Sequence, residues 1–189
     1  MEMAKAARAL ADSPDCDPQR GGEPMIYLNI GEPDFTAAPG VVEAASACLQ
    51  AGRTQYTPSN GLPALRQAIS RWYQQRWQLE VAPERILITS GASAALQLIT
   101  LALVDAGDEV LMPDPCYPCD RHFVAAAGGL ARLIPTTAAQ RFQLDVDSVA
   151  SHWNARTRGV LLASPSNPTG TSIEPSELRR IVQTVRERG

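Results

Sequence analysis

The sequence predicts an α/β protein with a mainly parallel (mixed) sheet that is covered by helices. From Arg85 onward, apolar runs of strand length alternate with segments of helical periodicity, and glycine or proline separates most of them. Parallel strands need crossover helices, so this alternation favours parallel strands with helices on both faces of the sheet. The expected strands are residues 85–89, 109–113, 131–135 and 159–163. The expected helices are residues 92–106, 117–127 and 146–155, with a last helix beginning near Pro175.

For the residues before Arg85, the sequence predicts helices and loops. A charged, alanine-rich helical pattern covers residues 1–12, turn formers fill residues 13–24, and Ile26–Ile30 is a short extended run. A helix is expected over Val41–Gln50, and apolar residues at helical spacing predict another from Leu62.

Composition excludes several classes of protein. The chain has 189 residues, of which 44% are hydrophobic and 20% charged, with a net charge of −3. This balance gives no reason to expect nucleic acid or a membrane surface as partner. No apolar run approaches the roughly 18 residues of a membrane span, and residues 1–12 lack the apolar core of a signal peptide. We therefore expect a cytoplasmic protein.

Three loops follow expected strands and should lie at one edge of the sheet, where ligands bind in α/β proteins. Ser90–Ser93 joins a strand to a helix through small residues, which leaves backbone N–H groups open to a phosphate. In the second loop, prolines flank Tyr117, whose ring offers a stacking platform for a flat heterocycle. The third loop carries Asn167, whose amide can donate to a ring oxygen. Together these groups suit pyridoxal 5′-phosphate.

The chain resembles a known family at five segments that occur in the family's order. These are Asn29-Ile30-Gly31-Glu32-Pro33-Asp34-Phe35, Gln55-Tyr56-Thr57-Pro58-Ser59-Asn60-Gly61 with Leu65-Arg66, Thr89-Ser90-Gly91-Ala92-Ser93, Pro113-Asp114-Pro115-Cys116-Tyr117-Pro118 and Ser164-Pro165-Ser166-Asn167-Pro168-Thr169-Gly170. On these segments it resembles the fold type I, class I/II aminotransferases, which depend on pyridoxal 5′-phosphate.

The resemblance implies a set of cofactor contacts. Gly91, Ala92 and Ser93 would bind the phosphate, Tyr117 would stack on the pyridine ring, and Asn167 would hydrogen-bond the phenolic oxygen. The Asn167-Pro168 bond is expected to be cis, as in relatives of this kind.

Further implications concern substrate, partner and domains. Gly31 would place its backbone near the substrate carboxylate, and Tyr56 would reach the phosphate of the other subunit in a homodimer. Amino acids and 2-oxo acids would be the substrates. Residues 1–40 would form an N-terminal arm or small-domain segment, and residues 41–189 the N-terminal part of the large domain.

The resemblance also implies groups that this sequence does not contain. Lys5 is the only lysine and matches no catalytic position, so the Schiff-base lysine is absent. We therefore expect the N-terminal half of an aminotransferase, inactive by itself and prone to aggregate. Two alternatives stay open: a non-catalytic half-domain, or another enzyme or regulator of this fold that uses the same cofactor, such as a lyase or a cofactor sensor.

Cys116 and Cys119 form a Cys-x-x-Cys pair between a strand and a helix, which permits a remote alternative, a thiol–disulfide oxidoreductase. The pair is also half of a zinc site, but Cys16 and Cys48 show no matching spacing and neither His122 nor His152 lies suitably with the pair, so no metal is expected.

Overall fold

The computed structural model describes residues 2–28 and 31–188. They fall into two compact units, with the boundary between Tyr56 and Thr57. The predicted domain division at residue 40 stays a prediction. None of the described helices is both long and apolar enough to cross a membrane.

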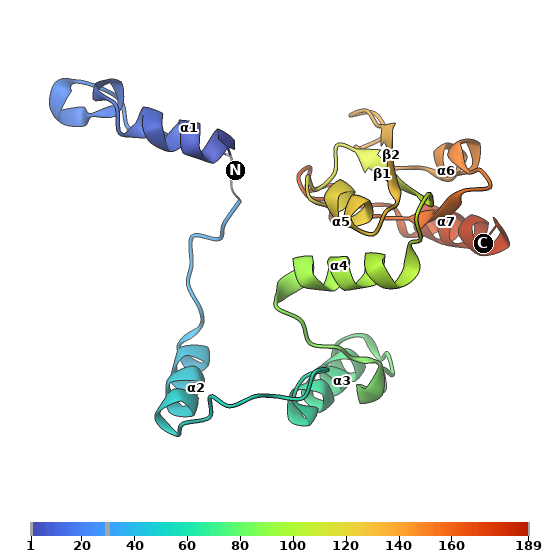
Figure 1. Ribbon diagram of the computed structural model, residues 1–189, viewed down its shortest axis with the longest axis horizontal. Coiled ribbons are helices and arrows are strands. Elements are labelled where there is room, and N and C mark those ends of the chain that lie inside the picture. The colour runs from blue at the N-terminus through green and yellow to red at the C-terminus, as the bar shows by residue number, and fades with distance from the viewer. Residues whose placement is uncertain (1, 29–30, 189) are drawn as a thin grey trace. The chain divides into compact units, whose positions relative to one another are not determined.

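The described part of the first unit contains short helices and no strand (Figure 1). Its elements are α1 (Glu2–Ala11), the 3-10 helices η1 (Pro14–Cys16) and η2 (Pro18–Arg20), and α2 (Pro39–Gln50). Helix α2 begins two residues before the expected start, because Pro39 occupies a first-turn position where its missing N–H costs nothing. Residues 26–28 form neither helix nor strand, and the rest of the expected extended run, residues 29 and 30, lies outside the described residues.

The second unit contains the sheet. Its elements are α3 (Pro63–Trp77), η3 (Pro83–Arg85), α4 (Gly91–Leu103), β1 (Glu109–Asp114), α5 (Asp120–Ala126), β2 (Leu130–Pro135), α6 (Val146–His152), β3 (Thr157–Val160) and α7 (Pro175–Arg188). The strand order is β2-β1-β3 and both pairings are parallel, which confirms the predicted fold class.

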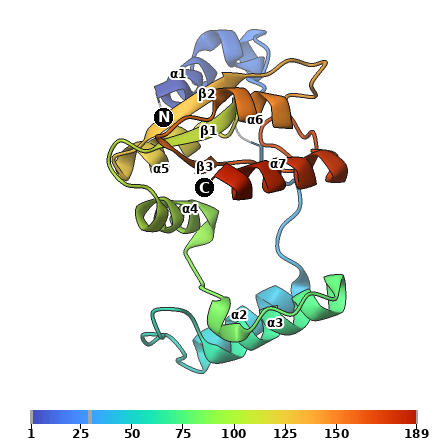
Figure 2. The ribbon, with the colours of Figure 1, turned by 90° about the vertical axis from the view of Figure 1, so that its right-hand side faces the viewer.

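Side chains of the central strand enter two separate cores. Val110 and Met112 pack on one face with Val124 of α5, and Leu111 packs on the other with Val149 of α6 and Ile181 of α7. Helix α5 therefore lies on one side of the sheet and helices α6 and α7 on the other (Figure 1, Figure 2). This alternation is the period of two that a strand imposes.

The prediction of a strand over residues 85–89 is wrong. Arg85 ends η3, and residues 86–90 form no strand. Their polar groups bond instead to the chain before them: the Ile88 N–H donates to the Asn60 carbonyl (3.2 Å), and Arg66 Nε donates to the Ile86 carbonyl (3.0 Å). Isolated bonds of this kind do not form the ladder that defines a strand.

Other boundaries moved by a few residues. Helix α5 begins at Asp120 rather than at residue 117, because a turn closed by the Asp120 N–H and the Tyr117 carbonyl (3.1 Å) comes first. Helix α6 ends at His152, since Trp153 is extended. Strand β3 begins at Thr157, where it pairs with Glu109, and ends at Val160 rather than at residue 163.

Candidate functional site

The first turn of α4 presents backbone donors to solvent. Gly91 has a φ of +83°, which favours glycine, and no atom lies within 4 Å of the position that a Cβ would take. Its own N–H donates to the Thr89 carbonyl (2.8 Å). The N–H groups of Ala92 and Ser93 belong to the first turn, which has no intrahelical acceptors, and both residues are exposed. Ala92 and Ser93 are therefore the accessible backbone donors of this turn.

Tyr117 is half-buried and follows the carboxyl end of β1. Its phenol lies near the Cys119 thiol and the Ser93 hydroxyl. The Cys119 contact raises the pKa of Tyr117, and the Ser93 contact opposes that change. Helix α4 packs against α5. The structure thus brings together two residues, Ser93 and Tyr117, that the sequence assigned to one site.

Asn167 is exposed in the loop after β3. The Leu161 N–H donates to the Leu111 carbonyl (2.9 Å), so this loop leaves the sheet beside the loop of Tyr117. The loop closes on itself: the Ser166 N–H donates to the Thr171 carbonyl and the Gly170 N–H to the Ser166 carbonyl, both at 2.8 Å. The Asn167-Pro168 bond is cis, as predicted.

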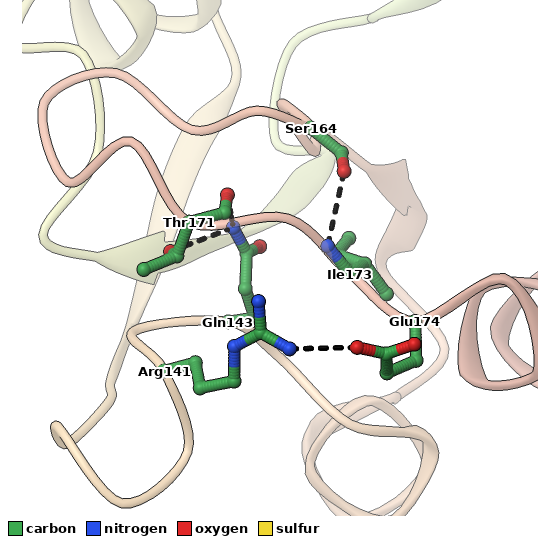
Figure 3. A network of polar contacts seen from close by, with 6 residues as sticks. All are labelled: Arg141, Gln143, Ser164, Thr171, Ile173 and Glu174. Carbon is green, nitrogen blue, oxygen red and sulfur yellow. Dashed lines mark hydrogen bonds and ion pairs between the residues drawn. The ribbon is translucent and has the colours of Figure 1, made fainter.

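Sequence reasoning missed the side chains that hold this loop (Figure 3). Gln143 Nε2 donates to the Thr171 carbonyl at 2.7 Å, and the Ser164 hydroxyl accepts from the Ile173 N–H at 3.0 Å. Gln143 lies 28 residues before Thr171 and in none of the five segments, so no local signal could have found it.

Gly31 and Tyr56 belong to the first unit and are exposed. No atom lies within 4 Å of the position of a Cβ on Gly31. Their expected roles, toward the substrate and toward a second subunit, stay predictions.

The Cys-x-x-Cys pair lacks the properties of a redox site. All the cysteines in the described part of the chain are free, and Cys116 is buried with Val110, Met112 and Val124. Burial raises the pKa of the Cys116 thiol, whereas a reactive thiol needs a lowered one. Asp120 beside it is also buried, and desolvation raises its pKa. Among residues 2–28 and 31–188, no three His, Cys, Asp or Glu side chains gather as metal ligands would.

A parallel sheet with helices on both faces is the architecture of an α/β protein, and in this class ligands bind beyond the carboxyl ends of the strands. The chain belongs to the class I and II aminotransferase family, whose family model matches residues 23–189.

Individual relatives agree with this assignment. The chain is 40% identical over 163 residues to the valine–pyruvate aminotransferase of Mycobacterium tuberculosis, which covers 86% of this chain and 42% of that protein. It is 36% identical over 166 residues to an aspartate aminotransferase of Bacillus sp. strain YM-2, a match that covers 88% of this chain and 42% of that protein. The crystal structure of an aminotransferase from Mycobacterium tuberculosis matches with a TM-score of 0.86 and 36% identity, over 100% of this chain and 46% of that one. The chain therefore spans a little under half the length of these relatives.

Proposed function

We propose that this chain holds pyridoxal 5′-phosphate at the carboxyl edge of its sheet. The activity that we propose for the whole protein is amino-group transfer from an L-amino acid to a 2-oxo acid. When bound, this cofactor supplies an aldehyde that reacts with amines and a pyridine ring that withdraws electrons from the substrate's α-carbon. Family membership supports the cofactor, and the packing of α4 against α5, with Ser93 near Tyr117, is the observation in this chain that carries the site.

The residues of the second unit fit the parts of such a cofactor. The N–H groups of Ala92 and Ser93, at the positive end of the α4 dipole, would hold the phosphate, and Gly91 would let it approach the backbone. The Tyr117 ring would cover one face of the pyridine ring and exclude water from it. The Asn167 amide would donate to the phenolic oxygen.

The remaining assignments concern substrate and partner. Gly31 would lie near the substrate carboxylate, and Tyr56 would contact the phosphate site of a second subunit in a homodimer. The relatives are named for different amino acids, aspartate and valine, so we assign only the substrate class.

The 189 residues by themselves should bind the cofactor without transferring amino groups. Lys5 is the only lysine and lies in α1, outside the five segments that carry the resemblance. Without a lysine at the site, no side chain is available to bind the aldehyde and move the α-proton.

The test uses pyridoxamine 5′-phosphate, which has no aldehyde to react with Lys5. Tyr117→Ala should raise its dissociation constant by up to about tenfold, since an aromatic stacking contact contributes roughly 0.5–1.5 kcal/mol. Tyr117→Phe keeps the ring and should stay within about threefold of the wild type. Equal affinities for Tyr117→Ala and the wild type would refute the stacking site.

The activity is tested separately. With pyridoxal 5′-phosphate and L-aspartate, the purified chain should form 2-oxo acid no faster than the free cofactor does. A faster, protein-dependent rate would contradict the expected inactivity of this chain alone.

A further inference from the structure

The Ser166–Thr171 loop carries Asn167, and its first and last residues are joined by a hydrogen bond. We call this junction of Ser166 with Thr171 the neck of the loop. The Thr171 carbonyl oxygen accepts from the Ser166 N–H (2.8 Å) and also from Gln143 Nε2 (2.7 Å). The same amide group lies 3.3 Å from Thr171 Oγ1, which is 2.8 Å from Thr169 Oγ1. Asn167 lies between these anchored residues, so its backbone position depends on the bonds at the neck.

Gln143 reaches this neck from a different segment of the chain. It ends a compact turn over residues 137–143, in which the Phe142 N–H donates to the Thr137 carbonyl at 2.9 Å and the Gln143 N–H to the Gln140 carbonyl at 3.1 Å. In Figure 3 the Gln143 side chain points at Thr171, with the Arg141–Glu174 ion pair beside it. The next residue, Leu144, is buried in the core against α6 and α7, which fixes the base of Gln143.

This arrangement has costs that packing alone does not explain. Arg141 and Phe142 both adopt left-handed backbone conformations, with φ of 55° and 54°, which side chains disfavour. Gln143 is 5% exposed, and its Oε1 has no hydrogen-bond partner among the described residues. Burying such an acceptor costs free energy, so an apolar side chain would serve the core better. What Gln143 provides instead is its Nε2 donor.

We propose that Gln143 is a positioning residue: its amide holds the neck of the Ser166–Thr171 loop and thereby places Asn167 against the cofactor's phenolic oxygen. The inference rests on the proposed function, because Asn167 matters only if that cofactor binds. Gln143 itself need not touch the cofactor.

The experiment compares two ligands, pyridoxamine 5′-phosphate and an analogue with hydrogen in place of the 3-hydroxyl group. Gln143→Met keeps the side-chain shape and removes the donor. It should weaken the binding of pyridoxamine 5′-phosphate about fivefold, which corresponds to the loss of one hydrogen bond, and leave the affinity for the analogue within about twofold of the wild type. It should also raise the pKa of the bound phenol, read from the pH dependence of ligand fluorescence. Glu174→Gln, which breaks the exposed ion pair between the same two segments, is the matched control and should change neither value.

A double-mutant cycle separates positioning from general stability. In an Asn167→Ala background, Gln143→Met should cause no further loss of affinity. An equal loss for both ligands, or a loss that persists without Asn167, would overturn the proposal.

Hydrogen exchange tests the loop without any ligand. The amides of Ser166 and Gly170 should exchange several-fold faster in Gln143→Met, while those of β1 stay protected. Unchanged exchange would overturn the inference. If the wild-type chain binds neither ligand, the proposed function fails, and the exchange rates alone then decide whether Gln143 holds the loop.

Discussion

Gly61 lies in the turn before α3, with a φ of +97°, and is buried against Ile88. A Cβ at this position would lie 2.7 Å from Ile88 Cβ and closer still to Ile88 Cγ1. We therefore expect Gly61→Ala to lower the free energy of unfolding by about 2–4 kcal/mol, through backbone strain and overpacking together. Urea titration of the chain measures this loss.

Gly107→Ala provides the control for this substitution. Gly107 also has a positive φ, +92°, but no atom lies within 4 Å of a Cβ there. Its replacement should cost only the backbone strain, roughly 1–2 kcal/mol. Equal losses of unfolding free energy at the two glycines would show that the contact with Ile88 does not add to the cost of Gly61→Ala.

Asp145 caps α6: its carboxylate accepts from the Ser148 N–H at 2.7 Å. Hydrogen bonds from Ser148 hold the pKa of Asp145 below its usual value. A lowered pKa means that the charged cap stabilises the fold above the unfolded-state pKa of about 3.9, and that this stability is lost as the pH falls through the folded pKa. Asp145→Ala should cost about 1 kcal/mol at pH 7 and less below pH ~4.

Asp145→Asn separates capping from charge, because asparagine caps helices about as well and does not titrate. Its stability should follow the wild type at pH 7 and lack the loss in acid that Asp145 causes. Parallel pH dependence of the two proteins would contradict the role of the charge.

Individual site residues could be predicted only where a short segment of the sequence carries the signal for them. Tyr117 lies between β1 and α5, so the strand pattern placed it at the carboxyl edge of the sheet. Ser93 was assigned to the same edge through the strand expected over residues 85–89, which did not form. Gln143 could not be found in this way. Its contact with Thr171 depends on how a turn with two left-handed residues folds, and neither Arg141 nor Phe142 is a residue type that signals such a conformation.

At the scale of elements, β1 and β2 begin and end close to the positions that the apolar pattern predicts, and α7 begins where it was expected. The strand expected over residues 85–89 did not form, and the reason is physical. An apolar run indicates a tendency to form a strand, but a strand exists only when a neighbouring strand pairs with it. Here Asn60 and Arg66 form hydrogen bonds with the backbone of this segment instead.

Helix α4 exposes part of its apolar surface. Leu98 and Leu101 are 54% and 57% exposed, whereas Thr100 is buried. Replacing both leucines by glutamine should reduce self-association, seen by sedimentation velocity, and change the stability by no more than about 0.5 kcal/mol. Val104→Ala, just after the helix and 8% exposed, is the contrast and should cost about 1–2 kcal/mol. Loss of stability in the leucine variant would mean that these side chains are buried in solution.

At the scale of the whole molecule, burial is unevenly divided. Both hydrophobic cores lie in the second unit, and none of the described residues before Thr57 is buried. We expect slow hydrogen exchange in β1 and β2 and fast exchange in α1 and α2, because helices of this length are marginal without packing.

Residues 57–189 expressed alone provide the comparison and should retain the protection of β1 and β2. Comparable protection of α2 and β1 in the whole chain would show that the first unit is stabilised by contacts beyond those described.

The alternation of β1 between two cores has a consequence for how this strand can vary. Val110 and Met112 pack in one core and Leu111 packs in the other, so neighbouring positions of the strand contact different sets of side chains. One residue inserted or deleted here would turn every following side chain to the opposite face. The strand can therefore exchange one apolar residue for another of similar volume, but its length is fixed.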